Sequence, residues 1–179
     1  VEKKSENKMQ VYTREEVMQE CIKYFNGDFM AADVWIKKYA LKDSQGNLYE
    51  KSPEDMHKRI AKEFARIESN FPNSLKEKEI FELLKNFKYI VPQGSPMAGI
   101  GNSFQVSSLS NCFVIGNDLE SDSYGGILKL DQELVQLMKR RAGVGLDLSF
   151  IRPAGRPVKN SALTSTGVVP YMERYSNST

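Results

Sequence analysis

The sequence predicts an all-α N-terminal domain that is followed by the opening of an α/β domain. Before about residue 90, apolar residues recur at helical spacing, and several of these stretches begin with residues typical of helix N-termini. Near Tyr89 the sequence becomes rich in proline, glycine and serine. A short apolar run, a helical pattern and a second apolar run then follow, which together indicate a β-α-β unit with parallel strands.

The first two helices are predicted from a capping box and from the spacing of apolar residues. Thr13 and Glu16 have the spacing of a capping box, and Gly27 ends the first helix. A second helix follows Asp28. The apolar stripe of the first helix is Val17, Cys21, Ile22 and Phe25, and that of the second helix is Ala32, Trp35, Ile36 and Tyr39. Because Cys21 belongs to such a stripe, we expect it to be a buried small hydrophobe.

Two further helices are predicted after the turn that contains Gly46. Ser52-Pro53 begins one, with Met56, Ile60, Phe64 and Ile67 as its buried face. A second capping box, Ser74 to Glu77, begins the other, with Ile80, Leu83, Leu84 and Phe87 inward. The only histidine, His57, is offset from the apolar stripe, so we expect it to be solvated. A single histidine also excludes a multi-histidine metal site.

The second half of the chain contains the β-α-β pattern. Residues 89–106 are expected to be irregular, and loops of this length are usually functional. Strands are predicted over 109–115 and 144–150, with a helix over 127–140 between them and a last helix that has Pro170 in its first turn. Two strands cannot form a stable parallel sheet. We therefore expect an incomplete α/β domain.

Composition excludes several classes of protein. The 25 basic and 23 acidic residues are interleaved and leave a net charge of +2, so there is no electrostatic footprint for nucleic acid. No apolar run is long enough to span a membrane, and the N-terminus is too polar for a signal peptide. Two cysteines make no disulfide framework, which favours a reducing cytoplasm.

Cys112 and a basic segment are the candidates for chemistry. Cys112 can be a structural strand residue, but the serines and the asparagine that precede it form a polar approach that suits a reachable redox or nucleophilic thiol. A redox pair would need a second thiol from elsewhere. Arg152, Arg156 and Lys159 follow a strand end, where parallel sheets bind ligands. They can hold a polyphosphate or form a solvated loop.

Several stretches of the sequence resemble the catalytic chain of ribonucleotide reductase. They include "VPQGSPMAGIGN", "SLSNCFVIGND" and "QLMKRRAGVGLDLSFIRPAGRPVKNSALTSTGVVPYMERYSN". The form that they resemble most is the bacterial adenosylcobalamin-dependent (class II) enzyme. Residues 1–10 are expected from their composition to be a disordered tail. The resemblance implies 11–90 as the α-helical N-terminal domain and 91–179 as the start of a ten-stranded α/β barrel.

The resemblance also implies roles in catalysis. Cys112 matches the first member of the cysteine pair that supplies reducing equivalents after a thiyl radical has abstracted a ribose hydrogen. Ser110 and Asn111 would line the substrate beside it. Ser95 matches the small hydroxyl residue that helps to hold the substrate phosphates.

A second nucleotide site is implied, for an allosteric dNTP or ATP effector. Asp118 matches the carboxylate that accepts from the effector ribose, and Arg152 matches the arginine on its phosphates. Lys159 lies in the adjoining loop. The helix over 127–140 would mediate a homodimer, and a thioredoxin-like protein would be the reductant.

We therefore expect an N-terminal portion of a ribonucleoside-diphosphate reductase that is inactive alone. Adenosylcobalamin would be bound by parts outside this chain. The alternative is a non-catalytic split subunit or nucleotide-binding module that needs a separate C-terminal chain. A free enzyme with Cys112 as nucleophile would lack a base, because the only histidine lies in the other domain.

Overall fold

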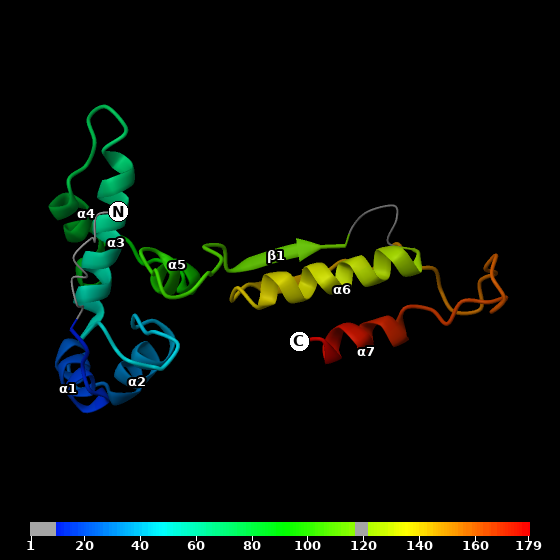
Figure 1. Ribbon diagram of the computed structural model, residues 1–179, viewed down its shortest axis with the longest axis horizontal. Helices are drawn as coiled ribbons and strands as arrows, with labels where there is room; N and C mark the ends of the chain where they lie inside the picture. Colours follow the sequence, from blue (N-terminus) through cyan, green and yellow to red (C-terminus); the bar gives the residue numbers. More distant parts are fainter. Residues whose placement is uncertain (1–9, 117–121) are drawn as a thin grey trace, which may run out of the picture. The chain divides into compact units, whose positions relative to one another are not determined.

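A computed structural model describes residues 10–116 and 122–179 of the chain. The chain divides into two compact units, the first ending at Leu109 and the second beginning at Ser110. In its described part the first unit is helical, and the second contains a parallel β-α-β unit and a final helix (Figure 1). This arrangement confirms the predicted fold class, an all-α domain followed by a partial α/β domain.

Local caps determine where the first helices begin. The first unit contains α1 (Arg14–Tyr24), α2 (Phe29–Lys38), α3 (Pro53–Glu68), α4 (Glu77–Leu84), the 3-10 turn η1 (Lys85–Phe87) and α5 (Gly94–Gly99). The predicted capping box at α1 is confirmed: the Thr13 backbone nitrogen donates to the Glu16 carboxylate at 2.8 Å, and the Glu16 nitrogen donates to the Thr13 hydroxyl at 3.3 Å. At α2, the Asp28 carboxylate accepts from the Ala31 nitrogen at 2.9 Å.

The capping box predicted at Ser74 is wrong. The helix begins later, at Glu77, and Lys76 is its N-cap residue. The backbone nitrogen of Lys76 donates to the Glu79 carboxylate at 2.7 Å, so a carboxylate in the first turn secures this start. At α3, Ser52 is the N-cap residue as predicted, but its side chain makes no capping hydrogen bond.

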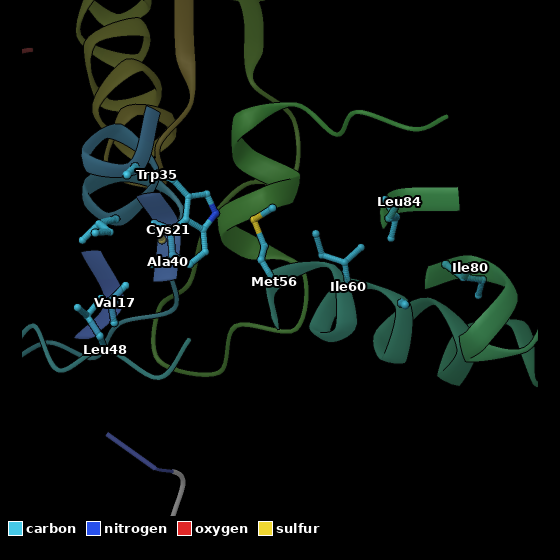
Figure 2. Packing of buried hydrophobic residues seen from close by; sticks show 12 residues of the cluster. Val17, Cys21, Trp35, Ala40, Leu48, Met56, Ile60, Ile80 and Leu84 are labelled. Carbon is cyan, nitrogen blue, oxygen red and sulfur yellow. The ribbon is translucent and has the colours of Figure 1, made fainter. Parts of the chain in front are cut away.

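The core of the first unit follows α3. Figure 2 shows Val17, Trp35 and Leu48 near one end of the cluster, Met56 and Ile60 along α3, and Ile80 and Leu84 from α4 at the other end. Buried members of the cluster are Val17, Cys21, Ala32, Trp35, Ile36, Ala40, Leu48, Met56, Ile60, Ala61, Ile80 and Leu84. The predicted burial of Cys21 is confirmed.

Two expectations for α3 are wrong. Phe64 and Ile67 are 42 % and 44 % exposed. Phe64 lines an open apolar groove of about 330 Å³ together with residues of α4 and α5, so the stripe continues beyond the closed core. His57 is fully buried rather than solvated, because Phe87 of η1 packs against its ring with centroids 4.6 Å apart.

The second unit is built on two parallel strands. It contains β1 (Cys112–Ile115), α6 (Tyr124–Met138), β2 (Gly143–Leu146) and α7 (Val169–Asn177). Cys112 pairs with Gly143, and the register continues to the pair Ile115 and Leu146. Both strands are shorter than predicted. In Figure 1 β1 runs along α6, whose residues Ile127, Leu130 and Leu134 form the buried cluster of this unit with Ile151 and Tyr175.

Polar contacts attach the last helix to α6. The Arg174 guanidinium on α7 donates to the Asp131 carboxylate at 2.9 Å. The Tyr175 hydroxyl donates to the Ile127 carbonyl at 3.1 Å. These contacts lie beside the buried cluster, so α6 is held by the strands and by α7. Among the helices of the described residues, none is long and apolar enough to cross a membrane.

Candidate functional site

Cys112 is the first residue of β1 and its side chain is exposed. Side chains alternate along a strand, so Cys112 and Val114 point to one face, and Phe113 and Ile115 to the other. Phe113 and Ile115 line a hollow with residues of α6, and Val114 is 79 % exposed. The Cys112 thiol therefore lies on the face of β1 that α6 does not cover.

A glycine on the neighbouring strand leaves space beside this thiol. Gly143 donates from its backbone nitrogen to the Asn111 carbonyl at 2.6 Å, which fixes the start of the strand pair. A Cβ atom at position 143 would lie 3.3 Å from that carbonyl oxygen and 3.9 Å from the Cys112 sulfur. A larger side chain at this position would therefore crowd the entrance to the thiol. Ser110 and Asn111 immediately precede Cys112, and Ser110 is exposed.

Arg152 is fixed by a carboxylate 30 residues earlier in the chain. Its backbone nitrogen donates to one Asp122 carboxylate oxygen at 3.0 Å, and its Nε donates to the other at 2.8 Å. The Nη1 atom donates to the Pro157 carbonyl at 3.3 Å. Asp122 directly precedes Ser123, whose hydroxyl accepts from the Gly126 nitrogen at 3.0 Å and caps α6. The helix start therefore determines where the carboxylate meets the guanidinium.

The segment after Arg152 is a folded hairpin rather than an irregular loop. Pro157 and Thr164 form an antiparallel bridge, and the Val158 nitrogen donates to the Leu163 carbonyl at 2.9 Å. The Ser165 nitrogen donates to the Arg156 carbonyl at 2.8 Å. This hairpin carries Lys159 into the wall of the same pocket as Arg152.

The pocket has a volume of about 380 Å³ and lies wholly within the second unit. Asp122, Arg152 and Lys159 are its charged lining residues, and the remaining lining includes aliphatic side chains and Asn160 as well as hydroxyl and aromatic groups. These include Ser123, Tyr124, Thr164, Ser165, Thr166 and Tyr171. A hydrogen bond to Tyr124, together with burial, raises the pKa of Tyr171. The pocket therefore offers cations for an anionic group, and neutral hydroxyls and rings for the remainder of a ligand.

Ser95 lies in the first unit, in the short helix α5. It is buried, at 5 % exposure. The end of α5 is closed by Asn102, whose side-chain nitrogen donates to the Ala98 carbonyl at 3.1 Å and whose backbone nitrogen donates to the Gly99 carbonyl at 3.1 Å. The segment expected to be irregular thus contains a helical turn with its own cap.

Two family models match the chain consecutively. The first, the all-alpha domain of ribonucleotide reductase, matches residues 25–102. The second, the barrel domain of ribonucleotide reductase, matches residues 110–179. The chain belongs to the ribonucleotide reductase family. The change from one matched domain to the other falls at the boundary between the two compact units.

Relatives of this chain carry names of the same family. It is 26 % identical over 112 residues to the ribonucleoside-diphosphate reductase subunit alpha of Buchnera aphidicola subsp. Baizongia pistaciae, which covers 61 % of the chain and 14 % of the relative. It is 29 % identical over 152 residues to the Mycoplasma genitalium protein of the same name, covering 84 % and 20 %. It is 32 % identical over 69 residues to the large chain of Neurospora crassa, covering 38 % and 7 %. The chain thus spans a fifth or less of the length of these relatives.

The site residues predicted from the sequence fall into three places. Arg152 and Lys159 line one pocket, Cys112 is at the strand start after Ser110 and Asn111, and Ser95 is in the other unit. Asp118 lies outside the described residues. Sequence reasoning missed Asp122, the carboxylate that contacts Arg152. The signal available for it was the pair Asp122-Ser123 at a helix start, where serine is a typical cap.

The described residues contain no group of three or more side chains that could bind a metal ion together. Burial lowers the pKa of His57 to about 4, so this imidazole is neutral at pH 7, but neither ring nitrogen has a hydrogen-bond partner and neither reaches solvent. The groups that the described residues offer for chemistry are therefore the exposed Cys112 thiol and the pocket that contains Arg152 and Lys159.

Proposed function

We propose that the chain forms part of a reductase that converts ribonucleotides to deoxyribonucleotides for DNA synthesis, and that Cys112 supplies one of the two thiols consumed. In the balanced reaction, the substrate loses its 2′-hydroxyl as water. Two thiols give up two electrons and two protons and become one disulfide, and a thioredoxin-like dithiol then reduces that disulfide. A thiyl radical elsewhere in the protein would open the reaction at the ribose.

The position of the Cys112 side chain is the observation that carries this proposal. A thiol must be exposed to meet a ribose and afterwards to exchange with a second thiol. Cys112 meets that requirement on the face of β1 away from α6, with Gly143 leaving space beside it. In an α/β barrel the helices cover the outer face of the sheet, so this face of β1 is the inner one.

Cys21 does not suit the role of second thiol. It is fully buried, its sulfur lies 3.3 Å from the Lys51 carbonyl, and burial raises its pKa to about 12. The thiolate that disulfide exchange requires is therefore scarce at neutral pH. The partner of Cys112 would come from the remainder of the protein.

The pocket of the second unit would bind the nucleotide effector. Arg152 and Lys159 supply positive charge for a polyphosphate, and an arginine suits bidentate contact with phosphate oxygens. Asp122 supplies a carboxylate that can accept from a ribose hydroxyl, the role expected of Asp118. Because every lining residue belongs to the second unit, nucleotide binding without turnover is the second candidate function of the chain alone.

The exposed apolar side chains of α6 support a homodimer through this helix. Leu128 and Val135 are seven residues apart, and are 50 % and 38 % exposed. Residues at this spacing lie on one face of a helix, and such a face is suited to a second copy. Ser95 would help to hold the substrate phosphates. Adenosylcobalamin, bound outside this chain, would supply the radical, and the protein would act in the cytoplasm.

Replacing Cys112 with serine in the complete reductase tests the catalytic proposal. We expect Cys112→Ser to abolish turnover that depends on a dithiol reductant and to leave effector affinity unchanged, because the pocket does not include Cys112. Turnover is followed as deoxyribonucleotide formed, and effector binding by calorimetry. The matched control is Cys21→Ala, whose folded fraction should turn over normally. Full turnover by Cys112→Ser would refute the assignment.

A further inference from the structure

Arg59 connects the long helix α3 to the end of the short helix α5. Its Nη2 donates to the Met97 carbonyl at 3.0 Å, and its Nη1 donates to the Ile100 carbonyl. Its Nε donates to the Glu50 carboxylate at 2.7 Å. The Arg59 side chain is only 10 % exposed. One guanidinium thus joins α3 to Glu50, nine residues earlier, and to the end of α5, about 40 residues later.

Glu50 holds this guanidinium in place. Its side chain is 4 % exposed, and both carboxylate oxygens have donors. One accepts from Arg59 Nε at 2.7 Å, and the other accepts from the Leu41 backbone nitrogen at 2.8 Å. A buried carboxylate with these partners fixes the plane of the arginine side chain, because the guanidinium fork has a rigid geometry.

The backbone after α5 is shaped to admit the arginine. Gly101 has a φ of +70°, which favours glycine, and a Cβ atom there would lie 2.9 Å from Arg59 Cγ. The guanidinium charge also lies at the C-terminal end of α5, where a cation is favoured. Arg59 and Asn102 between them satisfy the carbonyls of residues 97–100.

We propose that Arg59, oriented by Glu50, is a positioning residue. It fixes the position of α5, and therefore of Ser95, relative to the substrate phosphates. This inference rests on the proposed function, in which Ser95 contacts those phosphates. A helix of this length spans about 9 Å and moves as one rigid piece, so fixing its last turn also fixes its first. The long helix α3, through Arg59, thereby takes part in substrate binding without touching the substrate.

Arg66 provides a matched comparison on the same helix. It also pairs with a glutamate, Glu63, at 2.6 Å, but its side chain is 67 % exposed. Its guanidinium donates from Nε and Nη2 to the Glu63 carboxylate rather than to α5. Removing Arg66 deletes a charge and an ion pair from α3 while leaving the contacts of α5 in place. If a change in KM came only from the lost charge or from a less stable α3, it would appear on replacement of either Arg59 or Arg66.

The test measures kcat and KM for ribonucleotide reduction by the complete reductase. We expect Arg59→Ala to raise KM about tenfold or more, since small misplacements of a binding group are costly, with a smaller change in kcat and none in effector affinity. Arg59→Lys should recover only part of the loss, because an ammonium is a point charge rather than a fork. Arg66→Ala should leave KM unchanged.

A double-mutant cycle with Ser95→Ala shows whether Arg59 acts through Ser95. If it does, Arg59→Ala adds little to the KM increase of Ser95→Ala. Should Arg59→Ala fold poorly, Arg59→Lys takes its place in the cycle. The inference is overturned if the KM increases of Arg59→Ala and Ser95→Ala are fully additive, or if Arg66→Ala raises KM as much as Arg59→Ala does. Either result leaves the substrate role of Ser95 standing. An unchanged KM in Ser95→Ala alone overturns that role and the inference with it.

Discussion

Asp122 accepts two hydrogen bonds from Arg152, one from the backbone nitrogen at 3.0 Å and one from Nε at 2.8 Å. Arg152 also lines a pocket whose wall contains Lys159. The side chains of the pair are 37 % and 30 % exposed, so a ligand can reach them from solvent. The arginine is thus oriented before any anion arrives.

We predict that Arg152→Ala weakens binding of a nucleoside triphosphate by about 1.5–3 kcal/mol, the range for a hydrogen bond to a charged group. This corresponds to a loss in affinity of roughly 10- to 150-fold. Isothermal titration calorimetry with dATP at fixed salt measures it. The reason is the loss of a cation whose position the Asp122 carboxylate determines.

Arg156→Ala is the control for this prediction. Arg156 lies four residues further on and is exposed, and it does not line the pocket. Both variants remove one positive charge from the same segment. Equal losses of affinity would mean that general charge in the hairpin attracts the nucleotide, and would contradict a specific role for Arg152.

The sequence was sufficient where structure depends on short-range contacts. The cap at Thr13, a helix that follows Asp28 and the parallel β-α-β unit follow from spacing alone, and they are confirmed. Contacts between distant segments were not predictable in this way. Asp122 meets Arg152 across 30 residues, and the burial of His57 depends on how η1 folds back over α3.

Cysteine reactivity separates the two thiols. We predict that Cys112 reacts rapidly with a thiol reagent in the native chain, because its side chain is exposed, and that Cys21 reacts only on unfolding. Burial raises the pKa of Cys21 to about 12 and also blocks access. Timed alkylation with iodoacetamide, followed by peptide mass spectrometry with and without urea, measures the two rates.

In Cys112→Ser the rapid alkylation should disappear, and the slow alkylation of Cys21 should remain. The exposed position of Cys112 would be contradicted by two thiols that react at one common rate in the native protein. The reaction in urea provides the internal reference for both rates, because unfolding exposes the side chains of Cys112 and Cys21 equally.

His57 gives the first unit a pH-dependent stability. Burial lowers the pKa of His57 from 6.5 to about 4, with Glu54 acting weakly in the opposite direction. Between pH 6.5 and about 4 the unfolded chain therefore binds a proton that the folded chain does not, and the free energy of unfolding falls as the pH falls. The expected loss between pH 7 and pH 4 is about 2–3 kcal/mol. Urea titrations at several pH values measure it. Trp35, the only tryptophan, reports on this core by fluorescence.

His57→Leu tests the source of this dependence, because leucine fills similar space and does not titrate. Neither ring nitrogen of His57 has a hydrogen-bond partner, so the substitution leaves no new polar group unpaired and should cost little at pH 7. Carboxylates also titrate near pH 4, and they do so in both proteins. The difference in the free energy of unfolding between wild type and variant therefore isolates the contribution of the histidine. As the pH falls from 6.5, the variant should become more stable relative to the wild type. If the free energies of unfolding of the two proteins change in parallel over this pH range, His57 is not the source of the pH dependence.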